Sequence, residues 1–252
     1  MQNLFVPIGV LAVLALAPLT TPAFSQSAAK SEAKAGTPPS YCKPCLFYGG
    51  DFDINGPSPN ALPNELTYYG AVSTVYVPFA VPPNQTWTVA GLFSNNMLAV
   101  AVLDPPQIQW SISTGISQGN PGTVIASGTA QATLTPTGRS WDGMDEYTAL
   151  GRLNADELVT LTPGHYWMAV IPVCTVQSIR SLCSGASYYL SDVEDVPAPH
   201  AVGFESLDES YLWGAGQYFG ETGGPDGFCS EQGAGGGCDK FSAGLIGRAE
   251  LN

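Results

Sequence analysis

Charged residues are scarce in this sequence, and basic residues are the scarcest. Asp, Glu, Lys and Arg make up 12% of the chain, and 8 basic residues face 21 acidic ones, which gives a net charge of −13 at pH 7. This balance argues against nucleic acid as a partner, because its phosphates would be repelled. The acidity leaves carboxylates available for calcium, and the alternative is that it only keeps the protein soluble.

Long apolar runs are also missing, with one exception near the N-terminus. Residues 1–25 carry no charged side chain and contain an apolar run over residues 4–16, which is too short to span a bilayer stably. Small residues at Ala23 and Ser25 fit a signal peptidase site, so we expect a signal peptide over residues 1–25 with cleavage before Gln26. We therefore expect an exported protein without a membrane span, either secreted or held in the periplasm or at the cell surface.

Helical patterns are few, whereas 29 Gly and 21 Pro are typical of short strands joined by turns. Residues 26–40 are small and polar and are predicted to form a flexible linker, followed by a single β domain over residues 41–252. The one helix-compatible stretch, residues 153–158, is soon interrupted by Thr-rich sequence and Pro163. The candidate strands are residues 71–81, 86–93, 108–114, 123–134, 146–150, 164–172, 187–191 and 241–251.

Several of these segments alternate with the period of two that half-buried strands need. In residues 86–93, for example, Trp87 and Val89 fall on the same face. About eight such strands without helices between them predict an all-β fold of two packed antiparallel sheets, because an open single sheet would leave an apolar face in water. The predicted architecture is a jelly-roll-like β-sandwich.

Six cysteines fall into three local pairs. In an exported chain, an even number of cysteines predicts disulfides, although the sequence leaves their connectivity open. We expect neighbours to pair, so that each bridge pins one loop. The expected pairs are Cys42 with Cys45, Cys174 with Cys183, and Cys229 with Cys238.

Two segments of the chain suggest a family. Residues 161–170, LTPGHYWMAV, resemble a strand with the pattern L-x-P-G-x-Y-W in secreted bacterial β-sandwich modules of the choice-of-anchor type. Residues 110–112 and 122–128 are similar to the middle portion of those modules, and the resemblance covers about residues 68–172. It implies an extracellular module without an assigned reaction.

One motif associated with serine hydrolases occurs without the context that its chemistry needs. Residues 115–119 read G-x-S-x-G around Ser117, but the following Gln-Gly-Asn-Pro-Gly cannot begin the helix that a hydrolase requires. The two histidines, His165 and His200, are the only imidazole bases, and strand position explains His165 without catalysis. No catalytic residue is therefore assigned, and we expect the protein not to be an enzyme.

The segment Tyr41 to Cys45 contains the C-x-P-C spacing of thioredoxin-like oxidoreductases. Leu-Phe-Tyr-Gly-Gly-Asp follows it in place of the helix that lowers the thiol pKa in those enzymes. Zinc binding is the alternative for paired thiols, but an oxidising compartment favours a closed structural disulfide.

Residues 51–56 have the D-x-D-x-N-G spacing that arranges oxygen ligands around calcium. The Glu expected at the twelfth position of such a loop is replaced by Leu62, and a plain Asp/Asn turn is the alternative interpretation. The candidate ligands of a structural calcium ion are Asp51, Asp53, Asn55, Asn60 and Glu65. No other cofactor is expected.

Two tryptophans occur in Gly-rich surroundings with nearby acidic residues, whereas Trp87, Trp110 and Trp167 fall in strand patterns and are assigned to the core. Loop aromatics suit sugar stacking, because a flat ring covers the apolar face of a pyranose while polar groups bind its hydroxyls. The alternative is that both rings cap the ends of the core. The candidate ligand-binding residues are Trp141, Asp142, Asp145, Trp213 and Tyr218.

Three hypotheses for function follow from these features. The first is a non-catalytic extracellular module that binds a glycan or another surface component through its end loops. The second is a purely structural protein of an envelope or matrix. The third is a secreted hydrolase, which would need two facing carboxylates such as Asp142 with Asp145 or Asp192 with Glu194.

Overall fold

The structure is a computed structural model that describes residues 33–35, 37–52, 61–67, 70–98, 106–173, 188–193, 200–204, 210–214, 217–221 and 240–252. The described residues form β-strands and turns without a helix, which confirms the all-β prediction. The first eight strands are β1 (Ala33–Ala35), β2 (Cys45–Tyr48), β3 (Ala61–Pro63), β4 (Glu65–Thr67), β5 (Gly70–Val81), β6 (Gln85–Leu98), β7 (Gln107–Thr114) and β8 (Thr123–Trp141). The others are β9 (Met144–Arg152), β10 (Val159–Leu161), β11 (Gly164–Val173), β12 (Tyr188–Val193), β13 (Val202–Phe204), β14 (Tyr211–Gly214), β15 (Gln217–Glu221), β16 (Lys240–Phe241) and β17 (Ala243–Leu251).

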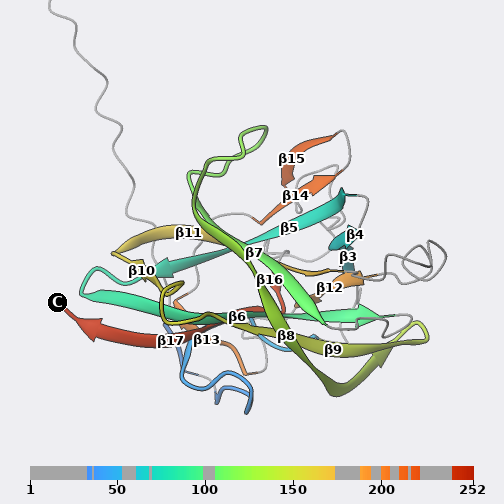
Figure 1. The fold of residues 1–252 in the computed structure, drawn as a ribbon, viewed down its shortest axis with the longest axis horizontal. Helices are drawn as coiled ribbons and strands as arrows, with labels where there is room; N and C mark the ends of the chain where they lie inside the picture. The colour runs from blue at the N-terminus through green and yellow to red at the C-terminus, as the bar shows by residue number, and fades with distance from the viewer. Residues whose placement is uncertain are drawn as a thin grey trace, which may run out of the picture.

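Twelve of these strands pair in one continuous antiparallel order, β15-β14-β5-β11-β7-β8-β9-β6-β17-β2-β13-β1. The remaining strands pair along parts of this order, and the parallel contact between Leu66 of β4 and Val173 of β11 is the exception to its antiparallel pattern. The sheet curls into a half-barrel (Figure 1). Within the described part of the chain, no helix is long and apolar enough to cross a membrane.

The long strand β8 carries the sheet around its bend. Its first part, from Thr123 to Gln131, pairs with β7, and from Ala132 onward it pairs with β9. The sequence predicts a strand that ends near residue 134, because Pro136 and Gly138 follow. The strand continues instead, since a register shift between Pro136 and Ser140 accommodates the proline without a hydrogen bond from its nitrogen.

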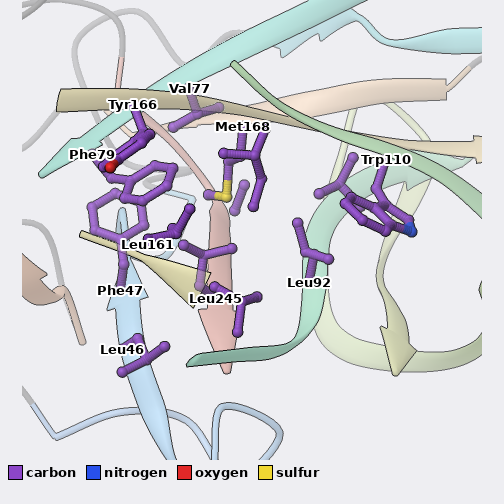
Figure 2. Packing of buried hydrophobic residues seen from close by; sticks show 14 of the residues in the cluster. Leu46, Phe47, Val77, Phe79, Leu92, Trp110, Leu161, Tyr166, Met168 and Leu245 are labelled. Carbon is purple, nitrogen blue, oxygen red and sulfur yellow. The ribbon is translucent and has the colours of Figure 1, made fainter. Parts of the chain in front are cut away.

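The hydrophobic core lies inside the bend. Val75, Val77, Phe79 and Val81 alternate along β5 and are all buried, as a strand with one inward face requires. They share one cluster with side chains of β7 and β11 on one flank and of β2, β6 and β17 on the other. Figure 2 shows Val77 and Met168 facing the side chains of Leu161 and Leu245 across this core.

Aromatic rings fill one end of the core. The ring of Phe79 lies 5.8 Å from that of Phe47, 5.6 Å from that of Tyr166 and 6.2 Å from that of Trp87, measured between ring centroids. Trp87, Trp110 and Trp167 are buried, which confirms their assignment to the interior. Each such ring removes a large apolar area from water when it is buried.

The second face of β6 is also covered. Phe93 packs there in a cluster with Tyr48, Ile246 and Cys42, where Cys42 and Cys45 form the predicted disulfide. The bridge joins residues only three apart, so it fixes the segment that covers the sheet rather than linking distant strands. The other four cysteines, Cys174, Cys183, Cys229 and Cys238, lie outside the described residues, as does the predicted signal peptide.

Two segments expected to lack strands can be compared with the structure. Residues 153–158 form a turn, in which the backbone amide of Asn154 donates to Glu157 Oε2. Residues 26–40 were expected to be a linker, but three of them form β1, which pairs with β13. Backbone pairing can recruit such a segment although its small side chains offer little to bury.

Candidate functional site

A groove of about 300 Å³ lies on the face of the sheet that points away from the core. Its first part is formed by three adjacent strands in the order β14, β5 and β11 (Figure 1). Thr74 and Tyr76 alternate with the inward valines of β5, and Ala169 and Ile171 alternate with inward residues of β11. Trp213 of β14 stands at one margin, so the groove carries an indole ring above a floor of small and apolar side chains.

The second part of the groove is formed by β7 and β8. Gln109 and Ser111 lie on β7, and Val124 and Ser127 lie on β8. Gln109, Val124 and Ser127 are exposed, and 55% of the surface of Val124 is accessible, which is high for a large apolar residue. No hydrogen bond among the described residues uses the side chains of Gln109, Ser111 or Ser127, so their polar groups are available to a ligand.

The ring of Trp213 is held in place by aromatic packing. Trp213 and Tyr76 pack against a buried cluster of Ile116, Trp167 and Tyr211, in which the last two rings lie 6.4 Å apart. Burial raises the pKa of the Tyr76 phenol, so this side chain stays neutral well above pH 7. The groove therefore combines a supported aromatic edge with uncharged hydrogen-bonding groups.

The sequence identifies Trp213 but not the other groove residues. Tyr76, Gln109, Ser111 and Ser127 sit in ordinary alternating strands, and alternation indicates only that they point away from the core. Their common site depends on the pairing of strands that are distant in sequence. Tyr218 lies on β15, which pairs with β14, and its side chain is not described.

Trp141 lies elsewhere, at the turn between β8 and β9. It is half-buried and packs with Met97, Met144 and Phe52, whose ring centroid lies 6.1 Å from that of Trp141. The turn that follows uses Asp142 with a positive φ of 50° and Gly143 with 76°. Trp141 and Trp213 thus belong to separate clusters, and the structure does not bring the two predicted rings into one site.

Asp142 and Asp145, the two acidic neighbours of Trp141, are both exposed. Asp142 is in the turn itself, and Asp145 pairs with Leu98 of β6 through the backbone. Ser117 lies in the tight turn between β7 and β8, where its amide donates to the carbonyl of Asn120. The predicted absence of a helix after Ser117 is confirmed, because a strand follows the turn.

Asp51 is the centre of a polar network near the end of β2. Its Oδ1 accepts a hydrogen bond of 2.6 Å from the Tyr48 hydroxyl, and its Oδ2 lies 3.0 Å from a terminal guanidinium nitrogen of Arg139 and 2.7 Å from Nδ1 of His200. A calcium ion at Oδ2 would compete with the guanidinium for the same oxygen. Of the other predicted ligands, Asp53, Asn55 and Asn60 lie outside the described residues, and Glu65 is placed in β4 without a described side chain.

Arg139 also pairs with Glu146, which is completely buried. Its Nε donates over 2.6 Å to Oε2 of Glu146, and the hydroxyl of Thr137 donates to the same oxygen over 2.6 Å. Burial by itself lowers the pKa of the Arg139 guanidinium, but electrostatic interactions with its neighbours, Glu146 above all, outweigh it and raise the pKa above its ordinary value. The guanidinium of Arg139 therefore stays protonated.

The network continues into the sheet through Asn95. Its amide nitrogen donates to the Tyr48 hydroxyl over 2.9 Å and to Oγ of Ser242 over 2.8 Å, and its carbonyl oxygen accepts from Thr148 over 2.6 Å. Burial, followed by the neighbouring Tyr41 and Asp51, raises the pKa of Tyr48 well above its usual value. These contacts join β2, β6 and β9 to the bend at Ser242 between β16 and β17, so the arrangement is that of a structural junction.

Sequence reasoning missed this junction. Arg139 and Glu146 are seven residues apart, and no local pattern marks them as partners. Glu146 lies between Asp145 and Tyr147 in the chain, so no run of apolar neighbours marks it as buried either.

Among the described residues, no group of three or more metal-ligating side chains is assembled. Comparison with known proteins adds no relative, since no family model, curated protein or solved structure matches the chain.

Proposed function

We propose that the chain is an exported, non-catalytic module that binds a glycan or another extracellular surface component. The observation that carries this proposal is the groove on the outer face of the sheet. It places Trp213 beside Tyr76 and opposite the hydroxyl and amide groups of Ser111, Ser127 and Gln109. An aromatic edge with neighbouring uncharged donors and acceptors is suited to a pyranose, which has an apolar face and a rim of hydroxyls.

The rigidity of the groove supports the same function. Its side chains project from paired strands rather than from free loops, and the aromatic cluster beneath Trp213 restrains that ring. A preformed site loses little conformational entropy when a ligand binds. The volume of about 300 Å³ is at the lower end of the range for small-molecule sites.

The proposal includes the finer architecture and the location of the protein. In this proposal, the two flanks of the bent sheet are the two layers of a jelly-roll-like sandwich and face each other across one core. The observation in its support is that residues of both flanks belong to the main hydrophobic cluster. The resemblance of residues 161–170 to choice-of-anchor modules and the predicted signal peptide support an extracellular or periplasmic location.

A glycan array and a pull-down with purified cell-wall polysaccharide test the proposal. We expect binding to at least one polysaccharide and its loss in Trp213→Ala, with the fold monitored by circular dichroism. Tyr147→Ala is a matched control, because Tyr147 is a half-buried aromatic residue outside the groove. Loss of binding in Trp141→Ala with retention in Trp213→Ala would instead place the site at the β8-β9 turn.

A purely structural role is the second candidate, and the half-buried position of Trp213 favours it. The ring packs against the cluster of Ile116 and Trp167, as a core-capping residue would. Under this hypothesis, both the array and the pull-down give no signal, and Trp213→Ala lowers the melting temperature without changing any retention.

A further inference from the structure

The groove has a consistent chemical character along its length. Its polar side chains in the described part of the chain are hydroxyl, amide, phenol and indole groups, and none of them is ionised at neutral pH. Along β7 and β8, the first charged residue is Arg139. Its guanidinium pairs with Asp51 and Glu146 in the polar network. Among the lining residues that the structure describes, there is thus neither a cation to pair with an acidic sugar nor a carboxylate to pair with a basic one.

The groove runs across the strands of the sheet. Its residues come from five adjacent strands in the order β14, β5, β11, β7 and β8. At a spacing of about 4.8 Å between strands, this order covers about 19 Å. Trp213 stands at one margin and the exposed Val124 at the other, and the polar groups of Gln109 and Ser111 lie between them. A ligand lying across the strands would meet apolar, polar and again apolar surface.

We infer that the groove selects an uncharged glycan chain that lies across the strands, with sugar faces against Trp213 and Val124 and hydroxyls bound by Gln109, Ser111 and Ser127. This inference rests on the proposed function and specifies its ligand class. Selection has two physical causes. A carboxylate or sulfate in the groove would lose hydration without gaining a cationic partner, and the net charge of −13 would repel it at longer range.

The decisive experiment measures the affinity of the purified protein for three oligosaccharides of equal length by isothermal titration calorimetry. The probes are cellohexaose, hexa-N-acetylchitohexaose and a galacturonic acid hexamer. We expect at least one neutral oligomer to bind, with an affinity that changes less than twofold between 50 mM and 500 mM NaCl, because no ion pair forms. The galacturonate oligomer is expected to show no binding at either salt concentration.

Side-chain variants test the assignment of roles. Gln109→Ala and Ser127→Ala are exposed substitutions that leave the core intact, and each should weaken binding of the neutral oligomer about fivefold through the loss of one hydrogen bond. Thr135→Ala removes an exposed hydroxyl from β8 beyond the groove and should not change the affinity. Unchanged affinity in both groove variants would overturn the inference.

The possible outcomes separate the inference from the function on which it rests. Binding of the galacturonate oligomer as tight as that of a neutral one would overturn the selectivity for uncharged glycans and leave glycan binding standing. The absence of binding to these probes and to the whole array would overturn both proposals. Binding of a neutral oligomer alone, weakened in the groove variants, would support both.

Discussion

Removal of the Arg139 guanidinium is the sharpest test of the polar network. In Arg139→Ala, the carboxylate of Glu146 remains buried without its 2.6 Å contact to Nε, and Asp51 loses the guanidinium at 3.0 Å. A carboxylate in the interior is costly unless a cation and hydrogen bonds compensate for its lost hydration. We therefore expect a large loss of stability, although the arginine side chain itself is partly exposed to solvent.

The magnitude follows from the burial of Glu146, whose side chain is 0% exposed, while that of Arg139 is 21% exposed. Breaking a buried ion pair by deleting one partner costs about 3–5 kcal/mol. For a chain of this size, each kcal/mol lowers the melting temperature by about 2–4 °C, which predicts a decrease of about 6–20 °C. A loss of this size is a large share of the stability of a typical protein, about 5–15 kcal/mol.

Urea unfolding followed by tryptophan fluorescence measures this loss, and thermal unfolding by circular dichroism checks it. Arg248→Ala is the matched control, because Arg248 pairs with Glu250 at 3.1 Å while their side chains are 71% and 59% exposed. It should change the free energy of unfolding by less than about 0.5 kcal/mol.

A double variant separates the ion pair from packing. Arg139→Met combined with Glu146→Leu removes both charges while keeping similar volume, and it should be more stable than Arg139→Ala. If Arg139→Ala and Arg248→Ala cost the same, the buried pair contributes nothing beyond a surface pair and the reasoning is wrong.

Three further predictions concern packing, pH and the disulfide. Gly247→Ala should cost about 1–3 kcal/mol in urea unfolding, because its Cβ would meet the backbone oxygen of Thr88, whereas Gly164→Ala finds ordinary contacts and should cost less. The raised pKa of Tyr48 means that only the unfolded state releases this proton near pH 10, so stability should fall above that pH, and less steeply in Tyr48→Phe. Reduction of the Cys42 disulfide, which closes a very short loop, should cost only about 2 kcal/mol in a melting experiment with and without reductant.

Much of the fold can be predicted from alternation along the sequence. The eight predicted strands correspond to β5 to β9, β11, β12 and β17, because each has apolar residues that must leave water on at least one face. Strand order cannot be predicted in the same way. The pairing of Gly244 with Phe93, for example, joins residues separated by most of the chain, and no local signal specifies it.

The candidate site divides in a similar way. Trp213 can be identified from the sequence, because a large aromatic residue next to glycines is not needed to form a turn. Gln109 and Ser127 become part of the groove only through the pairing of β7 with β8 and β11. For Asp51, the sequence pattern suggests a role that differs from its contacts in the structure. Its spacing is typical of a calcium loop, but its carboxylate accepts hydrogen bonds from protein side chains.

The course of β8 has a consequence for how the protein comes apart. One strand supplies backbone partners to both flanks of the bend, so neither flank can open while the other keeps its complete set of hydrogen bonds. Unfolding should therefore occur as one cooperative transition, with fluorescence and circular dichroism giving coincident curves. Such coupling denies proteases a half-open form that they could cleave.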